Sequence, residues 1–130
     1  MRILYGVAGE GMGHATRSRV VVDDLIEEHD LRLVASSDAY TYLAGHFPAA
    51  HDVWDLSLYD DAHDWERAVS DLTATVSTWP STVRDLYRLA EEFAPDVVVT
   101  DCESFVPLFA LRPSLPLTSP HHVHATDRCR

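Results

Sequence analysis

Apolar residues lie along the chain in two kinds of pattern that alternate with each other. Short continuous or alternating runs, typical of strands, occur at 2–7, 31–35, 53–58, 96–101 and 115–119. Between these runs, apolar residues recur at helical spacing, which predicts helices over 14–29, 39–45, 65–79, 81–93 and 104–112. Strands that alternate with helices form a parallel sheet covered on both faces. The sequence therefore predicts one α/β domain over residues 1–130, with a doubly wound parallel sheet.

The first and fourth predicted strands are the most apolar, so we expect them to be central neighbours in a sheet of order 3-2-1-4-5. The strand order reverses between these two strands, and a ligand crevice opens there beyond their carboxyl ends. The residues that follow them, 9–14 and 100–103, should therefore face each other across one cleft.

Three glycines alternate in the loop after the first predicted strand, at Gly9, Gly11 and Gly13. Their spacing matches neither the dinucleotide fingerprint nor the phosphate-binding P-loop. It predicts a loop whose backbone can approach a ligand closely, next to a helix N-terminus that favours anions. Glu10 could bind sugar hydroxyls and Arg17 a phosphate or carboxylate. The alternative is a tight turn without a ligand, flanked by exposed charged side chains.

His14 begins the first predicted helix, and Asp101 ends the fourth predicted strand. A neutral imidazole in a cleft can act as a general base, and it works best when a carboxylate orients its other nitrogen. We therefore take His14 and Asp101 as the candidate catalytic pair, acting by direct proton abstraction from a substrate hydroxyl. The alternative is a solvated histidine and an aspartate that caps the next helix.

The chain is strongly acidic, with 21 Asp and Glu residues against 10 basic ones and a formal net charge of -11. Such a chain is a poor candidate for binding nucleic acid or anionic lipid through a general basic surface. All the basic residues are arginines. The absence of lysine could reflect a GC-rich genome alone, but together with the acidity it favours the cytoplasm of a salt-accumulating halophile.

The cysteines, the histidines and the apolar runs argue against a disulfide-bonded, metal-binding, membrane-spanning or secreted protein. Cys102 and Cys129 form neither a disulfide framework nor a CxxC motif. The histidines at 121, 122 and 124 lack the spacing and partners of a metal site, so we predict no metal. No apolar run approaches the roughly 20 residues of a membrane span. The apolar run at the N-terminus is too short for a signal peptide. We therefore expect a cytoplasmic protein.

Taken together, these residues resemble a known family. The stretches 2–19 (with Gly9-Glu10-Gly11-Met12-Gly13-His14), 93–103 and 115–119, followed by His124, are similar to the N-terminal, acceptor-side domain of glycosyltransferases with the GT-B fold. The resemblance is to the group that includes the peptidoglycan lipid-intermediate N-acetylglucosaminyltransferase, within the UDP-glycosyltransferase superfamily. It covers nearly the whole chain.

The resemblance implies a Rossmann-like N-terminal domain for the acceptor and a second domain for the nucleotide-sugar donor, with no metal or other cofactor. It implies that His14 is the base and Asp101 its assistant, and it places Gly9, Glu10, Gly11, Gly13, Arg17 and His124 near the acceptor or phosphates. The acceptor would be a hydroxylated molecule. A lipid-linked acceptor is one option, which leaves open a peripheral position at the inner membrane face.

Two further expectations concern the chain as a whole. Because the sequence stops at Arg130, we expect it to lack the donor-binding domain and the end of its own sheet, and to be inactive alone. The donor would then be held by a missing C-terminal domain or a separate subunit. The alternatives to a transferase are a non-catalytic doubly wound binding or regulatory module and a fragment of a sugar-nucleotide epimerase of the same fold.

The charge generates a first prediction. Like charges repel most where screening is weak, and the Debye length falls from about 30 Å at 0.01 M salt to about 3 Å at 1 M. The melting temperature should therefore rise between these two KCl concentrations, measured by circular dichroism. A melting temperature independent of KCl would contradict adaptation to high salt and would leave genome composition as the explanation for the missing lysines.

Overall fold

A computed structural model describes residues 1–9, 11–48, 50–52, 80–81, 83–103, 106–111 and 115–120. In this part of the chain, strands and helices follow one another in the predicted manner. The strands are β1 (Arg2–Val7), β2 (Asp30–Ala35), β3 (Ala50–Asp52), β4 (Val97–Asp101) and β5 (Leu117–Thr118). The helices are α1 (Met12–Leu25), α2 (Ser37–Ala44), the 3₁₀ helix η1 (Val106–Leu111), and a helix that includes residues 80–81 and 83–93.

The strands form one parallel sheet of order β3-β2-β1-β4-β5. This confirms the predicted order and the central position of β1 and β4. The two central strands pair in register, with Val7 opposite Asp101. Their pairing continues past β1, because the Ala8 N–H donates to the Asp101 carbonyl oxygen at 3.0 Å. The glycine loop and the end of β4 therefore leave the sheet side by side.

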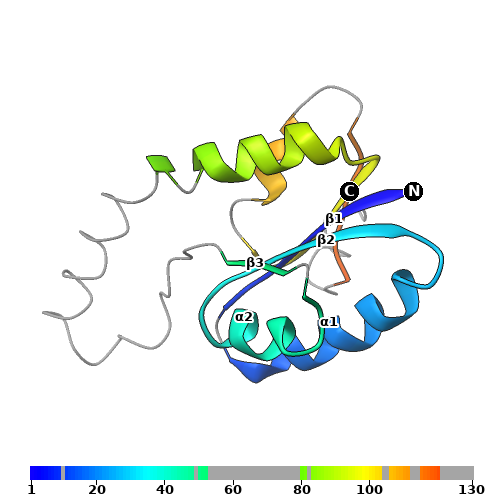
Figure 1. Cartoon of the computed structure of the whole chain (residues 1–130), viewed down its shortest axis with the longest axis vertical. Helices are drawn as coiled ribbons and strands as arrows, with labels where there is room; N and C mark the ends of the chain where they lie inside the picture. The colour runs from blue at the N-terminus through cyan, green and yellow to red at the C-terminus, as the bar shows by residue number, and fades with distance from the viewer. Residues whose placement is uncertain are drawn as a thin grey trace, which may run out of the picture.

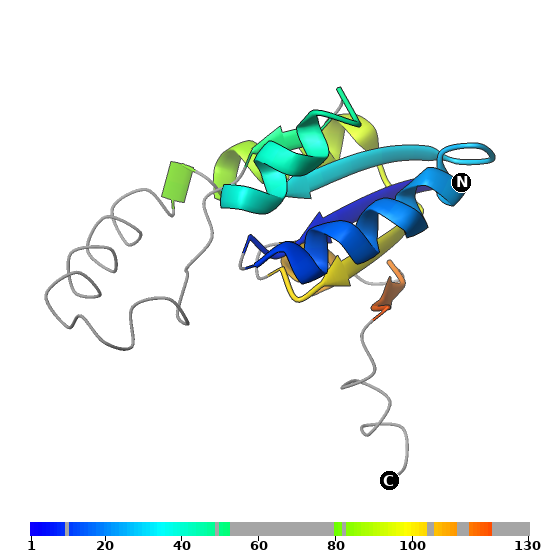
Figure 2. The ribbon, with the colours of Figure 1, turned by 90° about the horizontal axis from the view of Figure 1, so that it is seen from below.

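Each face of the sheet carries its own apolar core, and Figures 1 and 2 show helices on both faces of the sheet. On one face, alternate residues of β1 (Ile3, Tyr5 and Val7) pack with α1 and α2. On the other face, Leu4 packs with Val98, the 83–93 helix and η1. Because successive side chains of a strand point to opposite faces, a strand buried on both sides is largely apolar. That is why β1 and the first three residues of β4 read as continuous apolar runs, and why the buried Asp101 at the end of β4 needs polar partners.

Helix boundaries differ from the predictions by a few residues. Helix α1 begins at Met12 and includes Gly13, whereas the sequence predicted a start at His14. The short helix predicted over 104–112 is a 3₁₀ helix at Val106–Leu111, in keeping with Pro107, which lacks a backbone donor. No helix among the described residues is both long and apolar enough to cross a membrane.

The third strand begins earlier than predicted. The structure places β3 at Ala50–Asp52, whereas the sequence predicted a strand at 53–58. Within the described residues β3 is an edge strand that pairs with β2, and its three residues carry neither an apolar run nor a regular alternation. Residues 53–58, the helix predicted over 65–79 and the tail 121–130 lie outside the described residues.

Candidate active site

The three glycines of the loop differ in what the fold requires of them. Gly11 has φ +75°, a conformation that residues with a side chain rarely adopt. At Gly9, a Cβ atom would lie 2.4 Å from Ser36 Oγ, so the close approach of the loop to the end of β2 excludes a side chain. Gly13 has neither constraint: among the described residues, a Cβ atom there would meet nothing within 4 Å. The fold explains Gly9 and Gly11 but not Gly13.

Helix α1 presents three polar side chains to the end of β4. His14, Arg17 and Ser18 are three and four positions apart, which places them on one face of the helix. They meet Asp101, the last residue of β4, whose side chain is 0% exposed. The side chains of His14 and Arg17 are 26% and 38% exposed. The pair of His14 and Asp101 is therefore buried at the carboxylate and partly open to solvent at the imidazole.

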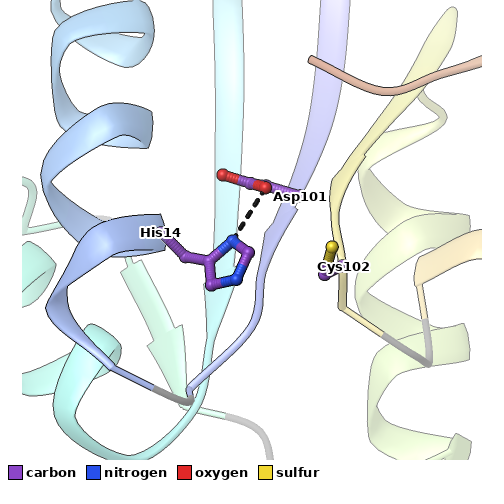
Figure 3. Close-up of side chains that lie close together, drawn as sticks. All are labelled: His14, Asp101 and Cys102. Carbon is purple, nitrogen blue, oxygen red and sulfur yellow. Dashed lines mark hydrogen bonds and ion pairs between the residues drawn. The ribbon is translucent and has the colours of Figure 1, made fainter. Parts of the chain in front are cut away.

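The Asp101 carboxylate accepts hydrogen bonds on both oxygens. His14 Nδ1 lies 2.9 Å from Oδ1, the interaction drawn in Figure 3. Ser18 Oγ donates to Oδ2 at 2.9 Å. The Arg17 guanidinium bridges the two oxygens, with Nε donating to Oδ2 at 3.2 Å and Nη2 donating to Oδ1. Tyr5 adds a longer bond behind Ser18, with its hydroxyl 3.4 Å from Ser18 Oγ.

These donors keep Asp101 ionised. Burial alone would raise the pKa of its carboxyl, but hydrogen bonds from Arg17, His14 and Ser18 outweigh burial and lower that pKa below its ordinary value. An ionised carboxylate can only accept, so the bond to His14 requires the proton on Nδ1. In the neutral ring the lone pair then lies on Nε2, the arrangement that a general base needs.

Cys102 follows Asp101 and turns the chain sharply, with φ 60°. Its sulfur lies near the pair in Figure 3. Partial desolvation of the sulfur and the charge of Asp101 both raise the pKa of the Cys102 thiol. The thiol is therefore protonated at neutral pH, a state in which cysteine is a poor nucleophile.

In the part of the chain that the structure describes, one group of three side chains has the spacing of metal ligands: His14, Asp101 and Cys102, with donor atoms within 4.8 Å of one another. The Arg17 guanidinium already bridges both oxygens of Asp101. A cation at this position would have to displace it.

The structure gathers most of the residues predicted for the site at one edge of the sheet. Gly9, Gly11 and Gly13 surround the start of α1, and His14 and Arg17 meet Asp101 there. Glu10 and His124 lie outside the described residues. Sequence reasoning missed Ser18 and Tyr5, which support the carboxylate from behind. The signal for Ser18 was its position four residues after His14, on the same face of a helix.

One comparison with known proteins gives a match. The family model described as glycosyl transferase family 1 matches residues 1–130, the whole chain. No curated protein and no solved structure matches the chain.

The buried carboxylate generates a prediction about stability and pH. Asp101→Asn should lower the free energy of unfolding at pH 7 by about 1.5–3 kcal/mol, the range for hydrogen bonds to a charged group. The pKa of Asp101 is lower in the folded protein than its value of about 3.9 in an unfolded chain. Its contribution is therefore complete above about pH 3.9 and is lost as the pH falls through the folded-state pKa.

Urea unfolding followed by circular dichroism tests this prediction. The difference between wild type and Asp101→Asn should stay constant from about pH 7 to 5 and shrink below about pH 3.9. The matched control is Asp23→Asn, since Asp23 is half-exposed on α1 and pairs with Arg19 at 3.6 Å. The control should change stability by less than about 1 kcal/mol. A difference for Asp101→Asn that is the same at all pH values would contradict the assignment of a buried, ionised Asp101.

Proposed function

The chain belongs to glycosyl transferase family 1, and from this premise we propose that His14 is the general base of a sugar transfer from a nucleotide-sugar to a hydroxyl acceptor. The sheet is of the Rossmann-like α/β type, consistent with the N-terminal half of a GT-B fold. The proposal adds to family membership a named base, an inverting reaction course, and independence from metal.

The observation that carries the proposal is the bond of 2.9 Å between His14 Nδ1 and Asp101 Oδ1. In the proposed reaction, Nε2 takes the proton of the acceptor hydroxyl as its oxygen attacks the anomeric carbon of the donor sugar. The bond from that carbon to the nucleotide phosphate breaks, and the leaving phosphate takes the bonding electrons. Asp101 holds the ring in position and stabilises the imidazolium that forms.

An inverting course agrees with the side chains around His14. A retaining course through a covalent intermediate would need a nucleophile. Among the described residues beside the pair, Cys102 is held as a thiol and Asp101 has both oxygens occupied by hydrogen bonds. Direct displacement by the acceptor oxygen needs only a base, and His14 can serve as one.

Independence from metal is supported by the N-terminus of α1. This end has no capping side-chain bond and no acidic residue in its first turn. Its backbone N–H groups and the positive end of the helix dipole can stabilise phosphate oxygens without a cation. We propose that the surface over Gly11 and Gly13 contacts the acceptor or the phosphates. The donor would be held mainly by a C-terminal domain or a separate subunit, and a lipid-linked acceptor at the membrane surface is compatible with this arrangement.

Replacement of the base gives the main test. His14→Ala should lower kcat by about 10²–10⁴, the usual contribution of a general base. The matched control is His46→Ala. His46 is an exposed histidine just after α2, with its Nδ1 2.9 Å from the carbonyl oxygen of Tyr42. The control should retain wild-type kcat.

The assay follows transfer of labelled sugar from nucleotide-sugars to a panel of hydroxyl acceptors by the intact gene product, with its donor-binding partner chain if that part is separate. Wild-type turnover in His14→Ala would overturn the assignment of the base. Conversion of the nucleotide-sugar to its epimer, without transfer, would identify an epimerase. Binding without either reaction would identify a non-catalytic module.

Gly13 provides an independent test of the ligand-contact surface. Gly13→Ala should keep or raise stability, by up to about 1 kcal/mol, because alanine favours the helix and its Cβ meets nothing within 4 Å. If a ligand approaches the backbone there, the same change should raise KM for the acceptor at least tenfold.

The control for this test is Gly45→Ala at the end of α2, where a Cβ atom would have an ordinary contact of 3.5 Å with the Tyr42 carbonyl oxygen. The thermal melting temperature and KM are measured for both variants. An unchanged KM in a folded Gly13→Ala variant would remove this surface from the proposal.

A further inference from the structure

We propose that Arg17 is a positioning residue, which holds the Asp101 carboxylate so that Asp101 receives the Nδ1 proton of His14. The sequence had suggested Arg17 as a ligand for the phosphate or carboxylate of a substrate. The geometry points instead to an internal role. The expected change in kcat rests on the proposed function of His14, whereas the expected change in the tautomer of His14 does not.

The first support is the bidentate geometry. Arg17 Nε donates to Oδ2 at 3.2 Å while Nη2 donates to Oδ1, so one planar group holds both oxygens of the carboxylate. His14 and Ser18 supply one bond each, to different oxygens. The guanidinium fork therefore fixes the plane of the carboxylate, and that plane decides where Oδ1 meets the imidazole.

The second support is the contact between the two donors. Arg17 Nη2 lies 3.1 Å from His14 Nδ1, and both groups are directed at Oδ1 of Asp101. A guanidinium has no acceptor, so a bond between these two nitrogens would need Arg17 to donate to an unprotonated Nδ1. With the proton on Nδ1 and given to Oδ1, the two groups are instead neighbouring donors to the same oxygen. Arg17 and His14 share one oxygen, and a shift of the guanidinium must move the point at which the histidine is held.

The third support is charge. Among the described residues, the titratable groups that face Asp101 are His14 and Arg17 from α1, Tyr5 from β1 and the adjoining Cys102. Of these, the arginine is the group that is positive at every relevant pH. Burial raises the pKa of Asp101, and the hydrogen bond from Arg17 is the foremost effect that lowers it. Without Arg17 the carboxyl should protonate at a higher pH, and its hold on Nδ1 should weaken there.

A positioning role and a substrate-binding role predict different kinetics. If Arg17 positions Asp101, Arg17→Ala should lower kcat by about 10–100-fold with little change in KM. Activity should also be lost at a higher pH on the acid side of the pH profile of kcat, because Asp101 protonates at a higher pH without the guanidinium beside it. Arg17→Lys retains the charge but loses the fork, so it should restore most of the pH profile and only part of kcat.

The decisive measurement is the tautomer of His14, read by nitrogen-15 NMR of histidine-labelled protein, with the signals assigned through His14→Gln. In the wild type the neutral ring should carry its proton on Nδ1. In Arg17→Ala the share of that tautomer should fall. The matched control is Arg19→Ala: Arg19 lies on the same helix and donates to the Tyr42 hydroxyl at 3.1 Å. The control should change neither the tautomer nor the pH profile.

The outcomes separate the two proposals. If the wild type shows no sugar transfer but Arg17→Ala alters the tautomer of His14, the positioning role is supported and the proposed function is contradicted. A raised KM with unchanged kcat and unchanged tautomer would make Arg17 a substrate ligand and overturn the inference, as would a wild-type His14 that carries its proton on Nε2. If Arg17→Ala does not fold, Arg17→Lys provides the test. Wild-type kcat and a wild-type tautomer of His14 in that variant would show that the bidentate guanidinium is not needed, and would overturn the inference.

Discussion

The site depends on one constraint: a carboxylate that is fully removed from water at the end of a central strand. Such a group is stable only where donors replace its hydration. The donors come from His14, Arg17 and Ser18 on a single face of α1, so the charge of Asp101 fixes how that helix sits against the end of β4. Packing of the two apolar cores holds the sheet together, but this charge sets the geometry at its carboxyl edge.

The strand order of the sheet by itself places His14 and Asp101 close together. Strands β1 and β4 are neighbours because both are buried on two faces, and the connections after them leave the same edge of the sheet. Gly9 then lets the loop pass close to Ser36 at the end of β2, and the φ of +75° at Gly11 turns the chain into α1. The backbone thus places His14 beside the end of β4, and the hydrogen bond to Asp101 then orients its ring.

The sequence predicted the fold, the strand order and the meeting of His14 with Asp101, because all three follow from apolar periodicity and the geometry of parallel sheets. The helical spacing places Arg17 and Ser18 on the same face as His14, but a serine or arginine near a helix start most often faces water. Their bonds to Asp101 depend on the burial of that carboxylate, which the packing of α1 on β4 shows and the sequence pattern does not. The third strand was predicted at 53–58, and its described residues Ala50–Asp52 were missed because they carry no apolar pattern.

The gradient of exposure across the cluster explains how one arrangement can be both rigid and reactive. Asp101 is closed to solvent, whereas His14 keeps 26% of its side chain exposed. A general base must be accessible to its substrate. Its hydrogen bond to a buried carboxylate is stronger than one to an exposed carboxylate, because water does not compete for the bond and the local dielectric is low. The imidazole joins these two environments: Nδ1 is held inside by Asp101, and Nε2 is on the opposite side of the ring. Gly13 lies one residue earlier on the same helix, and among the described residues a Cβ atom there would meet nothing within 4 Å, so no described side chain covers that helix terminus at this point.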